Sequence, residues 1–278
     1  MTHEVIQNAF GVERRAAIEA RDLKRAQGIK DLMKRVGRGY ARGWFTEDGQ
    51  ALLASPVVDV TTQDQDPLAS VVAEFRAGRL NTPEAVASNW QLRWRVWGEQ
   101  VGLNIAVPDF GGSQEGLNEH LLKGDKPFYV PSELSTQATR HLLGKIWPAM
   151  QSHAVAENTP VTNEVDHSGW RYTEASTNAP LLDTKEGDLR NKIKKVEAGR
   201  EGLPATEYII ASQDHKLLTG EYFDQGPTWS RLLGSRGGGG IVDASFDRGG
   251  DLGVGWGLDA DGHDPYLGGR SSVGVKKA

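Results

Sequence analysis

The N-terminal part of the chain places hydrophobic residues at helical spacing, with charged residues between them. Over residues 13–36, apolar side chains recur every three to five positions, which predicts an amphipathic helix. Further helices are predicted over 67–77 and 83–99, the second with Thr82 as its N-cap and Pro83 in its first turn. These patterns predict a mostly helical N-terminal region.

The helix predicted over 83–99 carries Trp90, Trp94 and Trp97 at positions i, i+4 and i+7. Such a stripe fits either a platform that stacks on sugars or a face buried in the core. Because large aromatic side chains are usually buried, we expect the buried stripe.

The middle of the chain alternates between short strands and helices. Residues 56–67 predict a short strand that leads into a loop, and residues 102–110 predict a strand that ends at a Gly-Gly turn. A helix is predicted over 132–150, and the polar stretch 153–169 is interpreted as a connection.

After this connection the pattern predicts one strand and then two helices. The strand is expected at 169–175, and the helices near 184–197 and 204–219. Gly220 is well placed as the C-cap of the second helix. From Trp229 onward the chain consists of short alternating runs and turns, so we expect it to be rich in β-structure.

The segment "LGVGWGL" at 252–258 shows the strictest alternation. In a strand its apolar side chains share one face, while Gly253, Gly255 and Gly257 share the other. Glycine weakens a strand, so stability alone would not select three glycines on the same face. Packing therefore fixes one face of this strand, and the other face is free to vary.

The residues on the free face have a genetic feature in common. Between residues 237 and 267 the chain has ten Gly and six Asp but no Asn. Gly, Asp, Ser, His and Tyr are all reached from an asparagine codon by changing only its adenines. This composition is expected when an Asn-rich template has been rewritten at adenines.

This pattern resembles the variable proteins of diversity-generating retroelements, in which a reverse transcriptase rewrites the 3′ end of a gene. The segments "GLPATEYIIA" (202–211), "TWSRLLGSR" (228–236) and "LGGRSSVGV" (267–275) are similar to motifs of that family. The resemblance implies a C-type lectin fold of the kind shared with formylglycine-generating enzymes, with a variable region at about 237–267. We expect an α+β protein with a mostly helical N-terminal domain of unknown role (1–125) and a lectin-fold domain (126–278).

The resemblance also implies roles for individual residues. Arg270 would hold the final strand against the fold. The core of the domain would contain Trp229, Leu232, Leu233, Phe246, Leu252, Val254, Trp256, Leu258 and Val273. The variable ligand-binding surface would consist of Asp243, Ser245, Asp247, Gly249, Asp251, Gly253, Gly255, Gly257, Asp259, Asp261, His263, Asp264 and Tyr266. With six Asp and only Arg248 as a basic residue, this surface favours a basic or flat target, and Tyr266 is its one clear aromatic anchor.

The composition gives no sign of catalysis, and we expect no catalytic residue, metal or cofactor. The chain has no Cys, which removes thiol chemistry and sets the formylglycine-generating activity aside. Its seven His show no metal-binding spacing, and His215 is expected at the surface or half-buried. An alternative is a fixed calcium- or carbohydrate-binding lectin, because Asp259, Asp261 and Asp264 carry oxygen ligands suited to calcium.

The expected partner is therefore a protein or cell-surface ligand that differs between variants. The N-terminal domain is a candidate for docking to a second partner. A net charge of −5 makes nucleic acid an unlikely partner, although residues 14–42 are basic. No signal peptide and no apolar run of about 18 residues is visible, so we expect no membrane span and a cytoplasmic or virion-associated protein.

Overall fold

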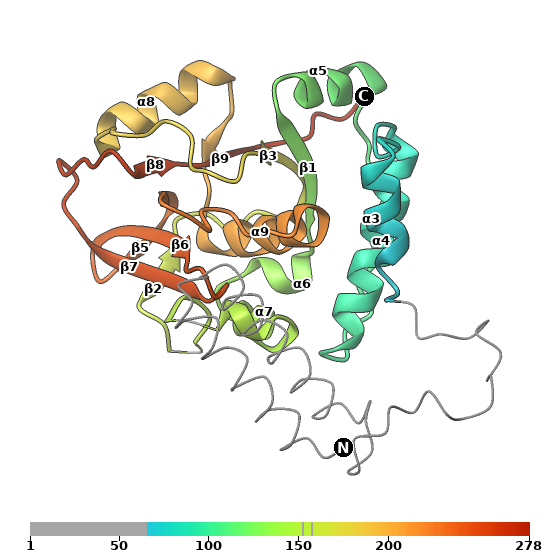
Figure 1. Cartoon of the computed structure of the whole chain (residues 1–278), viewed down its shortest axis with the longest axis horizontal. Helices are drawn as coiled ribbons and strands as arrows, with labels where there is room; N and C mark the ends of the chain where they lie inside the picture. The colour runs from blue at the N-terminus through green and yellow to red at the C-terminus, as the bar shows by residue number, and fades with distance from the viewer. Residues whose placement is uncertain (1–65, 152, 157) are drawn as a thin grey trace, which may run out of the picture. The chain divides into compact units, whose positions relative to one another are not determined.

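The computed structural model describes residues 66–278 except residues 152 and 157, and these residues form one compact unit (Figure 1). The helix predicted over 13–36 and the strand predicted at the start of 56–67 lie outside the described residues. Within the described part, helices and strands are mixed, so the protein is of the α+β type. No helix among these residues is long and apolar enough to span a membrane.

Three helices open the described part: α3 (Ala69–Arg76), α4 (Pro83–Glu99) and α5 (Gln114–Leu122). The predictions over 67–77 and 83–99 are confirmed. The Thr82 side chain caps α4 by accepting a hydrogen bond from the Ala85 amide at 3.2 Å. The strand predicted over 102–110 is wrong, because this stretch pairs with no strand and instead contributes Ile105, Val107 and Phe110 to the core.

The single helix predicted over 132–150 is broken into shorter pieces. These are α6 (Ser132–Ser135), α7 (His141–Ile146) and the 3₁₀ turn η3 (Pro148–Met150). The break lies at Thr136, whose backbone is extended (φ −83°, ψ 156°). The polar connection that follows contains the 3₁₀ turn η4 (His153–Val155) and a short strand, β2 (Val161–Asn163).

The strands form two sheets. The first has the order β1-β3-β9-β4, and all neighbouring strands in it are antiparallel. Here β1 is Asp125–Val130, β3 is Gly169–Glu174, β9 is Ser271–Gly274 and β4 is Glu201–Gly202. The second has the order β2-β5-β6-β7, where β5 is Trp229–Gly237, β6 is Gly240–Phe246 and β7 is Leu252–Leu258. Strand β8 (Leu267–Gly269) pairs parallel with β5. The strand predicted at 169–175 and the β-rich C-terminal part are confirmed.

Two more helices confirm their predictions. Helix α8 (Glu186–Val196) buries Leu189 and Ile193, whereas Val196 is exposed. Helix α9 (Ala205–Thr219) contacts β1, β2 and β5 and lies centrally in Figure 1. It ends at Gly220, whose φ of +91° is a left-handed conformation that glycine adopts without strain.

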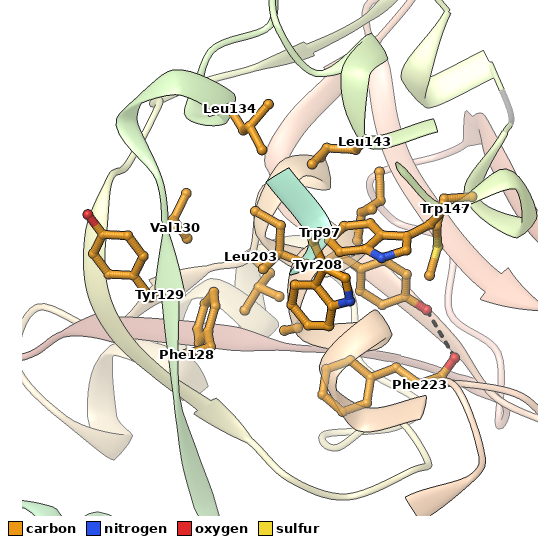
Figure 2. Close-up of a cluster of buried hydrophobic side chains, with 14 of the residues drawn as sticks. Trp97, Phe128, Tyr129, Val130, Leu134, Leu143, Trp147, Leu203, Tyr208 and Phe223 are labelled. Atoms are coloured by element: carbon orange, nitrogen blue, oxygen red, sulfur yellow. Dashed lines mark hydrogen bonds between the residues drawn. The ribbon is translucent and has the colours of Figure 1, made fainter. Parts of the chain in front are cut away.

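One hydrophobic cluster extends through the described unit from Leu68 to Val273. Figure 2 shows part of it, including Trp97, Trp147, Tyr208 and Phe223. Trp90, Trp94 and Trp97 are all buried, which confirms the buried stripe, and Trp94 and Trp97 meet edge to face with ring centroids 5.4 Å apart. Helices α3 to α5 thus share a core with the strands, and the domain boundary predicted at 125/126 falls inside this compact unit.

Arg270 has the structural role expected for it. Its buried guanidinium forms two hydrogen bonds to Asp224, at 3.2 and 3.1 Å, and donates to the carbonyls of Ser176 and Thr177. Because Arg270 lies between β8 and β9, these contacts attach the end of the chain to the interior. The Tyr208 hydroxyl donates to the same Asp224 carboxylate at 3.0 Å.

Candidate ligand-binding site

The β6–β7 hairpin has an inner face that is packed throughout. Val242, Ala244 and Phe246 are fully buried in the main cluster, and Leu252 of β7 joins them. Val254 and Trp256 are partly buried against the same cluster. The alternation predicted for 252–258 is confirmed, except at Leu258, whose side chain is outside the described part.

The opposite side of the hairpin is its outer face, made of Asp243 and Ser245 on β6 and Gly253, Gly255 and Gly257 on β7. A Cβ atom added to Gly257 would meet no heavy atom within 4 Å, and one added to Gly253 would meet only the Ser245 carbonyl oxygen, at 3.7 Å. None of the three glycines has a positive φ. Neither the backbone nor the packing therefore requires glycine at positions 253 and 257.

Other glycines of the same hairpin are required. A Cβ atom at Gly237 would lie 2.8 Å from Cβ of Trp256, and one at Gly240 would collide with the carbonyl oxygen of Trp256. Trp256 therefore excludes any larger residue at both positions. Residues 237–257 thus contain glycines of two kinds, which the sequence does not distinguish.

The turn that joins β6 to β7 is built by Asp247. Its side chain accepts a hydrogen bond from the Asp251 amide at 3.0 Å, and such backbone donors lower the pKa of this carboxyl. Gly250, with φ of +92°, completes the turn. Asp247, Gly249 and Asp251 are exposed as predicted, but Asp247 also has a structural role.

Asp243 and Ser245 correct the prediction of an exposed surface. They point away from the main cluster, yet they are only 5% and 7% exposed, because β6 is the central strand between β5 and β7. Asp243 lies between Arg231 and Gly255 in register, and a Cβ atom at Gly255 would lie 3.0 Å from both its carboxylate oxygens. Burial raises the pKa of Asp243, and nearby Arg231 opposes this shift.

Trp229 corrects the predicted core, because its side chain is 43% exposed. Its backbone amide donates to the carbonyl of Tyr266 at 2.8 Å, which holds these two residues side by side. Tyr266 is itself 57% exposed. The site therefore has two aromatic anchors instead of one.

These aromatic side chains line a surface depression of about 350 Å³, which we call the aromatic depression. Its residues are Pro227, Trp229, Asp243, Asp264, Tyr266 and Leu267. Asp243, Asp264 and Tyr266 were predicted as site residues, and the structure brings them together here. The ion pairs of this region involve Asp183 and Asp261. In the described part of the chain, neither Asp243 nor Asp264 has a cationic side chain within 4.0 Å.

The loop over 259–266, which carries Tyr266, is anchored at several points. The buried Arg231 donates from Nη2 to the Gly262 carbonyl, and His263 contacts Asp183 at 2.8 Å. Lys185 lies 3.7 Å from Asp261. The remaining predicted residues of this loop, Asp259, Asp261 and His263, are exposed as expected.

The acidic residues of this loop do not converge on a cation site. Asp259 accepts a hydrogen bond from the Asp261 amide at 3.2 Å, and Asp264 accepts one from the Tyr266 amide at 2.7 Å. Among residues 66–278 as described, no group of three His, Asp or Glu side chains is placed to hold a metal ion. The alternative of a calcium-binding lectin therefore gains no support from the geometry.

One buried cluster combines a serine, a histidine and a carboxylate. His167 Nδ1 lies 2.6 Å from one Glu207 oxygen, and the Ser272 hydroxyl donates to the other at 2.5 Å. Arg171 lies 3.1 Å from the same carboxylate. Because Glu207 separates the serine from the histidine, the histidine does not accept the serine proton as a triad requires. The cluster ties α9 to β9 and β3.

Comparisons with protein-family models, with curated proteins and with solved structures find no significant match to this chain.

Proposed function

We propose that this protein is a non-catalytic ligand-binding protein and that its binding surface is the aromatic depression together with the outer face of β6–β7. We further propose that this surface is diversified by a retroelement, on a C-type lectin fold. The observation that carries the proposal is the open space at Gly253 and Gly257, where an added Cβ atom meets at most one heavy atom within 4 Å and projects away from the packed inner face.

The order of the elements supports the same proposal. The segment 202–211 lies mostly in α9, the segment 228–236 lies mostly in β5, and the segment 267–275 contains β8 and β9. The hairpin of the variable region lies between these elements. A fixed scaffold on both sides of a tolerant surface is what repeated rewriting needs.

The chemistry of the aromatic depression favours a cationic ligand. Exposed Trp and Tyr faces attract ammonium and guanidinium groups, and the exposed Asp264 carboxylate, which has no cationic side chain within 4.0 Å in the described part of the chain, adds to the attraction. A basic peptide segment, with Lys or Arg inserted between Trp229 and Tyr266, fits this combination.

Genetic diversification is tested by sequencing the gene and its flanking DNA across a natural population. We expect changes at positions such as 253, 255 and 257, unchanged codons at the inner face, and an adenine-rich near-copy nearby. A uniform sequence without a second copy would overturn diversification.

Ligand class is tested with an immobilised lysine- and arginine-rich peptide and, in parallel, with neutral oligosaccharides. Removing a central aromatic anchor costs at least 2 kcal/mol, so Trp229→Ala and Tyr266→Ala should each weaken peptide binding by about 30-fold. Phe75→Ala is the matched control, because Phe75 is 40% exposed on α3, outside this site. Binding of the oligosaccharides alone would overturn the cationic ligand and favour a sugar-binding protein.

A further inference from the structure

A second cavity lies between α4, β1 and α9, away from the variable region. It has a volume of about 110 Å³ and is lined largely by apolar side chains, among them Val86, Trp90 and Leu218. Arg93, Lys126 and Asp214 also line it, and we call it the Arg93 cavity. An apolar cavity with a few charged groups is the usual form of a small-molecule site.

The charges of this cavity do not balance. Arg93 Nη1 lies 3.0 Å from one oxygen of Asp214, and Lys126 Nζ donates to the other at 2.9 Å. The Lys126 ammonium also donates to the Ala211 carbonyl at 2.9 Å. All three side chains are buried, so two cations share one carboxylate in a site that water screens poorly.

The remaining titratable group of the cavity does not supply a counter-charge. Burial lowers the pKa of His215 to about 3, so its ring is neutral at physiological pH. Burial also lowers the pKa of Lys126 to about 8, which leaves it mostly protonated at pH 7. The cavity therefore has an excess of one positive charge.

Arg93 has unused hydrogen-bonding capacity of a specific kind. Its Nε and Nη2 atoms are buried and have no hydrogen-bond partner. These two atoms lie on the same edge of the guanidinium, the edge that binds both oxygens of a carboxylate. Arg79 shows this pairing on the surface, where its Nε and Nη2 donate to Glu74 at 2.6 and 2.8 Å. Three other buried arginines of the described part, Arg140, Arg200 and Arg231, also have an unpaired Nε. In each of them, however, Nη2 on the same edge donates a hydrogen bond.

We propose that the Arg93 cavity binds a small monocarboxylate with a compact apolar body, whose head group pairs with Arg93 and Lys126. The carboxylate supplies the missing negative charge and two acceptors, and the apolar body contacts Trp90 and Leu218. At about 15 Å³ for each water-sized group, the volume accommodates about seven heavy atoms, the size of isovalerate.

Isovalerate is the probe, and isovaleramide is its uncharged control of the same shape. Titration of the full-length protein, followed by two-dimensional NMR, should show saturable binding with a Kd of about 1 mM or tighter. Isovaleramide should bind at least about tenfold more weakly, because it lacks the charge that Arg93 and Lys126 require. Isovalerate should also raise the Tm by ligand linkage, and isovaleramide should not.

Two variants address the cavity in different ways. Arg93→Lys keeps the charge but removes the two-donor edge, and Ala175→Leu fills the cavity while leaving its charges in place. Each should weaken isovalerate binding by about tenfold or more. Ala106→Leu, at an exposed position, is the matched control and should bind as the wild-type protein does.

Three results would overturn the proposal. The first is no binding of isovalerate to the wild-type protein, and the second is equal binding of isovaleramide. The third is binding that Ala175→Leu leaves unchanged, which would place the ligand elsewhere. Ala175→Leu leaves the charged side chains of Arg93 and Asp214 unchanged. Its effect on isovalerate binding therefore tests the location of the ligand even if Arg93→Lys fails to fold.

Discussion

The two faces of the β6–β7 hairpin are formed by the same two strands but obey opposite constraints. On the inner face, Phe246 stacks on Tyr222 with ring centroids 4.3 Å apart, and Leu252 is buried beside it. On the outer face, Gly253 and Gly257 have open space where a side chain would project. Packing therefore constrains every described position of the inner face, whereas the outer face contains two positions, 253 and 257, that packing leaves open.

This difference teaches how a binding surface is separated from the fold that carries it. A period of two along a strand assigns neighbouring residues to different environments. A change at one position can then alter binding, while a change at the next position alters folding. The following predictions test how complete this separation is.

The largest effect is expected for Phe246→Ala on the inner face. Removing a fully buried phenylalanine leaves a cavity and should lower the free energy of unfolding by about 3–5 kcal/mol. Urea denaturation measures this loss, with Gly253→Ala on the outer face as the control. A loss below about 1 kcal/mol for Phe246→Ala would show that the inner face does not determine stability.

An intermediate effect is expected for His215, which is buried with its ring centroid 4.8 Å from that of Phe223. Burial, with a smaller contribution from Lys126, lowers the pKa of His215 to about 3. The unfolded chain binds a proton below about pH 6.5, so stability is fully present above this pH and falls as the pH drops toward 3. Lowering the pH from 8 to 5 should therefore reduce the free energy of unfolding by about 2 kcal/mol through His215 alone.

The variant His215→Gln removes this titration and retains a side chain that can bond to Thr177, the present partner of His215. The pH-dependent loss of stability should therefore be smaller in the variant by about 2 kcal/mol, measured by urea denaturation at both pH values. Identical pH dependence in His215→Gln and the wild-type protein would contradict the buried neutral ring.

The smallest effect is expected for Gly257→Thr on the outer face. Threonine has the higher β-propensity and meets no atom there, so the free energy of unfolding should stay constant or rise by up to about 1 kcal/mol. Gly240→Thr is the matched control in the same hairpin. Its side chain would collide with the backbone of Trp256 and should cost about 1–3 kcal/mol. Equal losses at the two positions would refute the separation of the faces.

Local signals in the sequence predicted the elements whose causes are local. Helix α4 begins where Thr82 and Pro83 indicate, and α9 ends at Gly220, because caps act within one turn. The strand predicted over 102–110 has an alternating pattern but no partner strand, and pairing is not a local property. The three-residue strand β2 was missed for the converse reason, since its pairing with β5 bridges distant residues.

The candidate site was predicted only in part. The exposed glycines of β7 follow from alternation, but Trp229 was assigned to the core from the resemblance, and the structure shows it 43% exposed. A period of two along β5 places Trp229 and Arg231 on one face of the strand and Leu232 on the other. This alternation is visible in the sequence. The burial of Asp243 depends on its position in a central strand, which only the sheet order reveals. The pairing of the two aromatic anchors joins β5 to the loop before β8 and has no local signature.

The position of β9 in the first sheet has a consequence for the diversification proposed above. Strand β9 lies between β3 and β4, yet it is translated after the whole of residues 237–267. A stop codon or frameshift introduced in that segment would remove an interior strand and also Arg270, the partner of the buried Asp224. Such a chain would lose part of its core and leave a buried carboxylate unpaired, so it should not fold. Under the proposed diversification, folding itself would therefore select for an intact reading frame through residues 237–267.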